Sequence, residues 1–415
     1  MVAPRRSVAI EAVTELRPTS KALNVSVDLS TAENLFTKPS RKTIRVVTGA
    51  ELLRSLPLSR LLDTSLSTLR LIVCENLELL DAPYELGVSI LIHAAQTHPV
   101  RFVGLSNSLN DPADLAAWLD VDPLALHSFR PSDRDQSLTI HTQTFTIPQS
   151  AALFKAMAKP VHMAIQKVPG GPAIVFVPSR NLCRNIARDL ITQCALETEL
   201  DRGYLSDDVD VDALAHYRLR LQDAELLDFI SRGIGFFHEG IAKEDRTVML
   251  ELYAEGRLRV LIVPRDACWA LPVRATTVVV MGTQYLHVTD EERQMRDYAL
   301  EELVRMQGRA VRHDGAGHFH LFCQVESKDT FLRFLNDGLP LESKLLQTGV
   351  LRAWYHDRRK DGSIADKQQA VDALSFTFLA RRLTSNPVYY DCSSTSINEL
   401  LSRVVDSLDE EVAGG

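Results

Sequence analysis

Residues 305–312 read RMQGRAVR and lie at the end of an amphipathic helical pattern. Arg309 and Arg312 stand three positions apart, and two glycines after them open a mainly apolar run at residues 319–323. This order predicts a helix, a sharp turn and a buried strand, with two arginines where the helix ends. Guanidinium groups bind phosphate oxygens in pairs, so the stretch predicts a phosphate-binding turn. The alternative is a solvated helix end whose arginines interact favourably with the C-terminal helix dipole.

Short apolar runs alternate with amphipathic helical patterns on both sides of this stretch. We predict strands at residues 44–48, 71–74, 101–105, 173–177, 234–237, 260–263, 278–281 and 319–323. Runs that are apolar at nearly every position are typical of strands buried on both faces of a parallel sheet. Because the strands alternate with helices, the fold class is α/β, with one parallel-sheet domain at residues 1–135 and a second at residues 136–330.

Polar residues directly follow several of the predicted strands. Glu75 and Ser106 come after strands of the first domain, and Ser179 and Arg180 come after the first strand of the second domain. Ligands bind at the carboxyl ends of parallel strands, so these four residues are candidates for a binding site. Residues 238–239, a histidine and a glutamate, have the chemistry of a metal or base pair. No third ligand lies near them in the sequence, which favours a role in capping their loop or a role between the domains.

The strand pattern stops near residue 331, and we predict a small helical domain over residues 331–415. One of its helices is expected at residues 367–383, and the last helix carries a single apolar stripe. Arg381 and Arg382 lie near the end of the first of these helices. They are expected to be solvated, and binding of nucleic acid is the alternative.

Composition limits the possible functions. The chain has 46 basic and 54 acidic residues and a net charge of -8, so any contact with nucleic acid must be a local patch or groove. The six cysteines include no Cys-x-x-Cys pair, which argues against a zinc site and a disulfide framework and indicates a reducing compartment. No apolar run approaches membrane-spanning length and no secretion signal is evident. We therefore predict a soluble intracellular protein with no bound structural metal and no membrane partner.

Taken in order, these motifs resemble those of the Ski-like superfamily-two RNA helicases, most of all the C-terminal cassette of the large two-cassette spliceosomal members. The matching segments, for motifs Ia, Ib, II, III, IV, the histidine-containing motif, V, VI and the winged-helix region, are residues 2–5, 47–51, 74–77, 105–108, 174–180, 235–240, 267–270, 305–312 and 370–390. The likeness covers nearly the whole chain, and the ordered set is more specific than any one motif.

The resemblance implies two RecA-like domains followed by a winged-helix-type domain. It also implies ATP and Mg²⁺ as cofactors, RNA or a ribonucleoprotein and other splicing proteins as partners, and a nuclear location. The residues that it singles out are, for catalysis, Glu75, Arg309 and Arg312; for nucleotide binding, Gly308, Arg309 and Arg312; and for contacts with the RNA backbone, Ser106, Ser179 and Arg180.

The departures from the family pattern concern nucleotide chemistry. The sequence contains no Gly-x-x-x-x-Gly-Lys-Ser/Thr, the loop that cradles a triphosphate. Cys74 stands where the family has the aspartate that binds Mg²⁺, and Leu77 stands where it has a histidine. Motif VI has Arg305 and Val311 in place of glutamine and glycine. Because the sequence starts at motif Ia, the first domain is expected to be incomplete and to lack the central strand of its sheet, with unpaired strand edges and lower stability.

Three functions remain open. The first is a degenerate, non-hydrolysing helicase cassette that serves as an interaction scaffold in pre-mRNA splicing or another RNA-processing particle. The second is part of an active ATP-dependent RNA helicase whose P-loop is encoded upstream. The third is a simple nucleic-acid-binding fragment. Without a P-loop, Glu75 and the two arginines are expected to be remnants, because such arginines stabilise a transition state only when nucleotide is already positioned.

Overall fold

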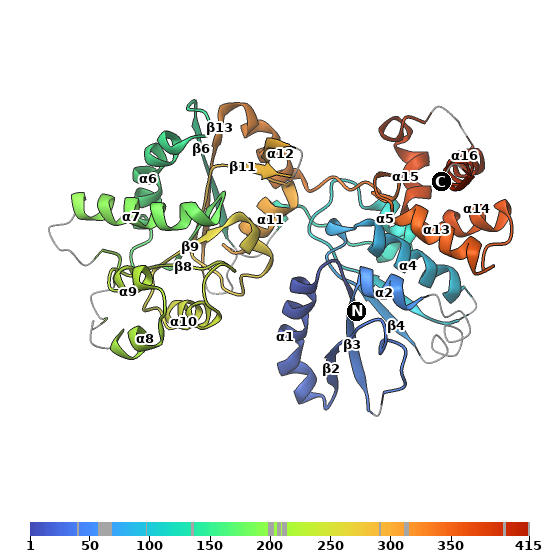
Figure 1. The fold of residues 1–415 in the computed structure, drawn as a ribbon, viewed down its shortest axis with the longest axis horizontal. Coiled ribbons are helices and arrows are strands. Elements are labelled where there is room, and N and C mark those ends of the chain that lie inside the picture. Colours follow the sequence, from blue (N-terminus) through green and yellow to red (C-terminus); the bar gives the residue numbers. More distant parts are fainter. Residues whose placement is uncertain are drawn as a thin grey trace. The chain divides into compact units, whose positions relative to one another are not determined.

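The computed structural model describes residues 1–39, 41–56, 69–96, 98–133, 137–197, 203–205, 209, 214–289, 292–310, 315–392 and 396–413. The chain divides into two compact units (Figure 1). Unit 1 combines Met1–Arg130 with Asp337–Gly415, and unit 2 is Pro131–Asn336. The segment predicted as a third, C-terminal domain therefore packs with the first domain in one unit.

Unit 1 is built on a five-stranded parallel sheet with the order β2-β3-β1-β4-β5. The strands are β1 (Val2–Ala3), β2 (Ser26–Leu29), β3 (Thr43–Thr48), β4 (Leu71–Cys74) and β5 (Arg101–Gly104). The expectation that the centre of this sheet lacks a strand is wrong. Val2 pairs with Val47 on one side and with Cys74 on the other, and it is 3% exposed. Two residues are too few to give a strand pattern in the sequence.

Helices cover both faces of this sheet. On one face, α1 (Arg6–Ala22) packs Val8 and Val13 against Val46 of β3. Side chains alternate along a strand, so the next residue of β3 points to the opposite face, where α2 (Gly49–Ser55) and α4 (Ala82–Ala95) lie. Gly49 allows these two helices to approach, because a Cβ at this position would lie 2.5 Å from the Cα of Tyr84.

Unit 2 is built on a six-stranded sheet with the order β6-β13-β10-β7-β9-β8, and all five pairings are parallel. The strands are β6 (Leu138–Phe145), β7 (Ala173–Val177), β8 (Ile234–Phe236), β9 (Val260–Pro264), β10 (Thr277–Met281) and β13 (Gly317–Gln324). Residues of β7, β9 and β10 are fully buried, as predicted for strands covered on both faces.

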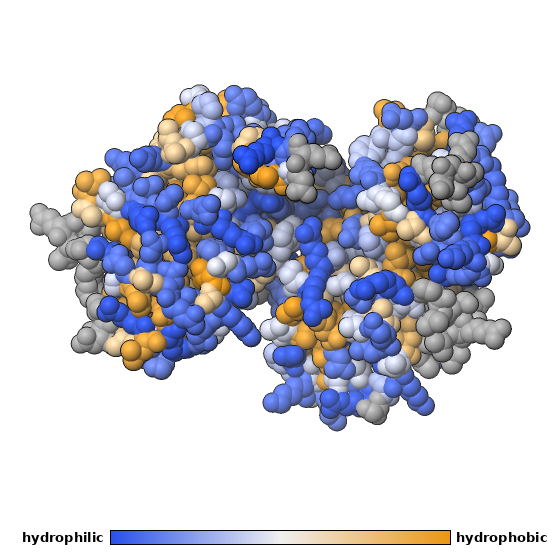
Figure 2. All heavy atoms as spheres, in the orientation of Figure 1, coloured by the Kyte–Doolittle hydropathy of each residue, from blue (hydrophilic) through white to orange (hydrophobic). Residues whose placement is uncertain are grey.

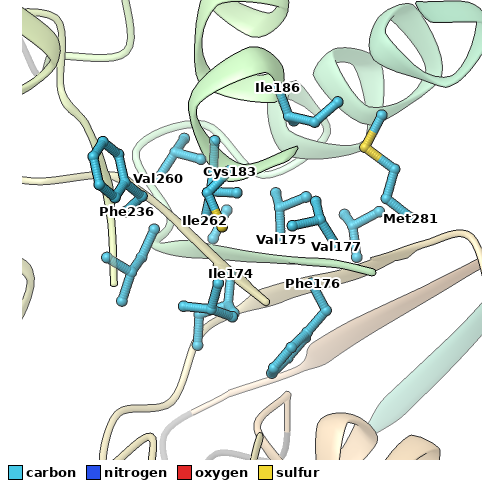
Figure 3. Close-up of a cluster of buried hydrophobic side chains, with 14 of the residues drawn as sticks. Ile174, Val175, Phe176, Val177, Cys183, Ile186, Phe236, Val260, Ile262 and Met281 are labelled. Carbon is cyan, nitrogen blue, oxygen red and sulfur yellow. The ribbon is translucent and has the colours of Figure 1, made fainter. Parts of the chain in front are cut away.

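Figure 3 shows how β7 fills both sides of the unit 2 core. Val175 and Val177 point toward Cys183 and Ile186 of α7 (Arg180–Glu197), whereas Phe176 points to the other face. The remaining main helices of this unit are α6 (Ala151–Gln166), α10 (Lys243–Ala254) and α11 (Leu300–Gly308). Apolar residues are mostly inside each unit, and the face in Figure 2 is dominated by hydrophilic residues with small scattered apolar patches.

Among the elements of unit 2 that the sequence did not predict is an antiparallel hairpin of β11 (Gln284–Val288) and β12 (Arg293–Asp297). Leu286 lies opposite Met295 in this hairpin, and both side chains are exposed. The hairpin is stabilised by cross-strand pairs and has no buried face of its own, so its sequence carries little of the apolar signal on which strand prediction depends.

The C-terminal helices of unit 1 are α13 (Val350–Lys360), α14 (Lys367–Ser375), α15 (Phe378–Ser385) and α16 (Ile397–Ala413). The single helix predicted at residues 367–383 is wrong, since the chain turns between α14 and α15. Thr377 makes this turn: its hydroxyl donates to Leu374 O and accepts the backbone N–H of Ala380. The apolar stripe predicted for the last helix is confirmed, with Leu401 and Val405 fully buried.

The expectation that Arg382 is solvated is also wrong. Its side chain is 9% exposed, and its Nε donates to Glu342 Oε2 at 3.0 Å. Its other nitrogens donate to Glu342 Oε1 and to Asp114, which lies on α5 (Ala113–Trp118). Both partners lie far from Arg382 in sequence, so local pattern could not reveal the network. The network joins α15 to α5 and to the segment that leads into the C-terminal helices.

Glu85 is a second polar connection inside unit 1. Its side chain is fully buried, and its two oxygens accept the hydroxyl of Ser343 and the backbone N–H of Leu379, each at 2.8 Å. It thereby joins α4 to the start of α15. Burial raises the pKa of this carboxyl from 4.5 to about 7, because two hydrogen bonds offset only part of its lost hydration.

We predict that Arg382→Ala lowers the free energy of unfolding of unit 1 by about 3–5 kcal/mol, because the partly buried carboxylates of Glu342 and Asp114 lose the cation that offsets their charge. Denaturant unfolding followed by tryptophan fluorescence measures this. The control is Arg381→Ala, since Arg381 is the exposed neighbour in the same helix. Equal stability of the two variants would contradict the network.

We further predict that Glu85→Gln changes how stability depends on pH. The folded-state pKa is about 7 and the unfolded value is 4.5, so the folded state holds its proton more tightly. The stability contributed by this group is complete below pH 4.5 and is lost as pH rises through 7, by about 3 kcal/mol in total. The glutamine variant keeps the shape and loses this dependence. Urea unfolding at several pH values measures this, with Glu15→Gln, at an exposed position of α1, as control. The wild type and the control should lose stability between pH 5 and 8, and Glu85→Gln should not.

Candidate functional site

The predicted residues of unit 1 lie at the carboxyl edge of its sheet. Glu75 directly follows β4 and Ser106 lies two residues beyond β5, which pairs with β4 in parallel. The backbone of Glu75 is held on both sides: its N–H donates to Val2 O at 2.8 Å, and its carbonyl accepts the hydroxyl of Tyr84 at 3.0 Å. Glu75 and Ser106 therefore come from neighbouring strand ends, as the sequence predicted.

The sequence reading missed Glu78, which connects these strand ends. It is 4% exposed, and its carboxylate accepts the hydroxyl of Ser106 at 3.2 Å and the side-chain amide of Asn107 at 2.7 Å. It also accepts the backbone N–H of Asn107 at 3.1 Å and the amide of Asn76 at 3.0 Å. The family resemblance implies, at the position of Leu77, a histidine that links nucleotide state to motif III. In this chain the next residue, Glu78, contacts the motif III residues Ser106 and Asn107.

Two signals could have identified Glu78. It is an acidic residue inside an otherwise apolar segment, and it follows a strand end by four residues. A buried carboxylate needs several donors, and Ser106 and Asn107 are the nearest polar residues of the next strand end. Ser106 was predicted to contact RNA, and in this structure its hydroxyl is already bonded to Glu78.

The unit 1 site does not suit a magnesium-bound nucleotide. Cys74, at the position of the metal-binding aspartate, is fully buried, and burial raises the pKa of its thiol to about 12. A neutral thiol is a poor ligand for a hard cation that prefers oxygen. In the parts of the chain that the structure describes, no group of three or more His, Cys, Asp or Glu side chains is placed to hold a metal ion. The implied ATP and Mg²⁺ therefore do not fit the described residues of this site.

The predicted residues of unit 2 lie beside an open depression of about 450 Å³ at the carboxyl ends of β7 and β9. Ser179 and Arg180 follow β7 and are both exposed. Arg265 and Asp266 follow β9, and Tyr285 of the hairpin closes the other side. Polar donors, a guanidinium group and an aromatic ring thus surround a hollow that is open to solvent. Such a set of groups is typical of surfaces that bind a nucleic-acid backbone without reading its sequence.

Arg265 is the residue that shapes this depression, and the sequence reading did not single it out. Its guanidinium carbon lies 3.7 Å from the centre of the Tyr285 ring, and it donates a hydrogen bond to the buried carboxylate of Glu302. Glu302 also accepts the backbone N–H of Ala299 at 3.2 Å at the start of α11. These contacts join the end of β9, the hairpin and α11 into one wall.

Arg180 is engaged by two carboxylates. Its Nη2 lies 3.2 Å from Asp266 and 3.4 Å from Glu239. The loop role predicted for residues 238–239 is confirmed for His238, whose Nδ1 accepts the backbone N–H of Gly240 at 3.1 Å. Burial, and then the charge of nearby Arg180, lower the pKa of His238, so its ring is neutral at pH 7.

The described part of the motif VI segment, residues 305–310, lies elsewhere in unit 2. The carbonyl of Arg309 accepts the backbone N–H of Ala275 at 2.9 Å, and that of Gly308 accepts Nη1 of Arg274 at 2.8 Å. Both partners precede β10, so Gly308 and Arg309 lie at the amino end of this strand. Arg309 is only 5% exposed. Arg312 lies outside the described residues, and the two-arginine phosphate clamp therefore stays a prediction.

The structure thus separates two sets of predicted residues within unit 2. Ser179 and Arg180 lie at the carboxyl end of β7, and Gly308 and Arg309 lie at the amino end of its parallel neighbour β10. The cause is the direction of α11. This helix starts near Arg265 at the carboxyl edge and ends beside Ala275 at the amino edge.

Comparison with known proteins agrees with this architecture. A family profile described as a winged helix-turn-helix domain matches residues 360–413. The human U5 small nuclear ribonucleoprotein 200 kDa helicase is 34% identical over 322 residues, which cover 75% of this chain and 15% of that protein. RQC trigger complex helicase SLH1 of Saccharomyces cerevisiae is 35% identical over 331 residues, covering 77% of this chain and 16% of that protein. Pre-mRNA-splicing factor brr2 of Schizosaccharomyces pombe is 32% identical over 352 residues, covering 81% and 16%. The chain therefore spans about a sixth of the length of these relatives.

Two parallel α/β units that carry the ordered motifs, together with a winged-helix domain, define a superfamily-two helicase-type cassette. The chain belongs to the Ski-like family of these helicases, with the U5 200 kDa helicases and brr2 among its relatives. In the described part of the chain, no helix has the length and apolar character needed to cross a membrane.

Proposed function

We propose that this chain is a helicase-related module that binds RNA without hydrolysing nucleotide, and that it serves as an interaction scaffold in pre-mRNA splicing or another RNA-processing particle of the nucleus. The observation that carries this proposal is the state of the magnesium position. Cys74 is fully buried there as a neutral thiol, with a pKa of about 12. The depression beside Ser179 and Arg180 is open by comparison and keeps polar and aromatic groups at its rim.

RNA binding is assigned to the unit 2 depression. Ser179 and Arg180 offer donors to phosphate oxygens, and Tyr285 offers an aromatic ring next to them. Phosphate contacts hold a strand in position, and aromatic rings accept any base, so the expected binding is independent of sequence. The relatives of this chain, which include a helicase of the U5 small nuclear ribonucleoprotein and a pre-mRNA-splicing factor, support RNA as the ligand.

We attribute the proposed lack of hydrolysis to residues of unit 1 and of the motif VI segment, residues 305–312. Leu77 offers no polar group, and the sequence has no P-loop motif that would hold a triphosphate. Arg309 is 5% exposed and its backbone is fixed at the amino end of β10. With no positioned nucleotide, Glu75 and Arg309 have no transition state to stabilise. Their proposed role is structural, at a strand end and at a helix end.

The second candidate is part of an active ATP-dependent RNA helicase, which would bind ATP with Mg²⁺ through a P-loop supplied from outside this sequence. The retention of Glu75 and Arg309 at the motif positions favours it. In that case Glu75 would orient or deprotonate the attacking water, and Arg309 with Arg312 would contact the phosphates. A plain nucleic-acid-binding fragment without protein partners is the third candidate.

The RNA site is tested with Arg180→Ala in the 415-residue protein. We expect the affinity for a 12-nucleotide oligouridylate to fall about 5-fold, which corresponds to about 1 kcal/mol for one charge-assisted contact. The slope of log affinity against log salt should also decrease by about 0.7, the value for one phosphate contact on a single strand. Fluorescence anisotropy measures both quantities. The control is Arg218→Ala, which removes the same charge from the exposed face of α8 (Ala215–Arg220). Equal affinities of the two variants would reject this RNA site.

Nucleotide chemistry is tested by titrating the same protein with ATP and Mg²⁺ in calorimetry. We expect no saturable heat up to millimolar ATP and no RNA-stimulated release of phosphate, because the described residues offer neither a metal ligand set nor a phosphate cradle. A micromolar affinity together with RNA-stimulated phosphate release would reject the scaffold proposal and favour the helicase candidate.

A further inference from the structure

The candidate RNA-binding arginine does not face the depression as a free cation. Asp266 lies 3.2 Å and Glu239 lies 3.4 Å from Nη2 of Arg180. The two carboxylates come from different loops, one after β9 and one after β8. Their side chains are 50% and 75% exposed, so both can also point into water. Burial therefore does not force either acid to pair with Arg180.

The second arginine of the depression is engaged as well. Arg265 donates to the buried carboxylate of Glu302 and stacks on Tyr285. The two guanidinium groups that line the hollow thus contact three carboxylates, of which Asp266 also lines the hollow. In this arrangement the depression is not a cationic site, and a phosphate that enters it meets two exposed acids beside its intended partner.

From this geometry we propose that Asp266 and Glu239 form an acidic gate, which competes with the phosphates of single-stranded RNA for Arg180 and lowers the affinity of the site. The inference rests on the proposed RNA-binding function of the depression. Exposed ion pairs are weak, each worth only about 0.2–1 kcal/mol, so a phosphate can displace them. Phosphate and the two acids compete for the same guanidinium nitrogen, and binding therefore requires Asp266 and Glu239 to turn away from Arg180.

The gate is tested by replacing both acids with their amides, D266N and E239Q, in one protein. The amides keep size and polarity and lose the charge. We expect the affinity for the 12-nucleotide oligouridylate to rise about 3- to 10-fold in low salt, and each single variant to give part of this increase. The matched control is E244Q with E251Q, which removes the two carboxylates that pair with the half-buried Arg220 elsewhere in unit 2. The protein that carries both D266N and E239Q is called the gate variant. If it binds the oligouridylate no more tightly than this control, the inference is overturned.

Adding Arg180→Ala to the gate variant gives a triple variant, which tests whether the two acids act through Arg180. If the gate acts through Arg180, the gain in affinity disappears in the triple variant, because the acids have no cation left to compete for. A gain that persists without Arg180 would overturn the inference, since it would reflect only general charge. Failure of the proposed function looks different: Arg180→Ala would then leave RNA affinity unchanged in the wild-type background and in the gate variant. Unfolding midpoints in urea, which should agree for all of these surface variants, exclude misfolding as the cause.

Discussion

Parallel strand pairing is the constraint on which the rest of this molecule depends. The strands of both large sheets pair in parallel, and a parallel sheet is stable only when helices cover both of its faces. The buried strands must then be apolar along their length, as β7 and β9 are. Polar side chains are therefore found mainly at the strand ends. Because the strands run parallel, their carboxyl ends all lie at one edge of the sheet. Glu75 and Ser106 in unit 1 lie together for this reason, and so do Arg180 and Asp266 in unit 2.

The same constraint explains how the unit 1 edge could change its chemistry and keep its fold. Cys74 is the last residue of a central strand and is fully buried, so a thiol there packs as a small apolar group. An aspartate at this position would need a metal or other partner to offset its desolvation. Glu78 forms a polar link between the two strand ends, since it accepts hydrogen bonds from Ser106 and Asn107. The loops at this edge are therefore held together by protein groups.

The sequence pattern predicts the elements whose position depends on residues close together in the chain. Leu71–Cys74 and Ala173–Val177 were placed to the residue, because an apolar strand between polar ends gives a strong local signal. The two-residue strand Val2–Ala3 gave no signal, since its place is set by pairing with strands that arrive later in the chain. Arg382 was misjudged for the same reason, as its partners Asp114 and Glu342 are distant in sequence.

The candidate site was predicted only in part, and the reason is again distance along the chain. Strand ends identified Ser179 and Arg180, which are adjacent residues. The partners that decide what Arg180 can do, Asp266 and Glu239, follow other strands and reach it only when β8, β9 and β7 lie side by side. A motif identifies a side chain. Whether the charge of that side chain is available to bind phosphate depends on the acids that the fold places beside it. For this chain, the motif alone predicts a phosphate-binding cation, and the folded arrangement predicts a cation whose binding strength is set by two neighbouring carboxylates.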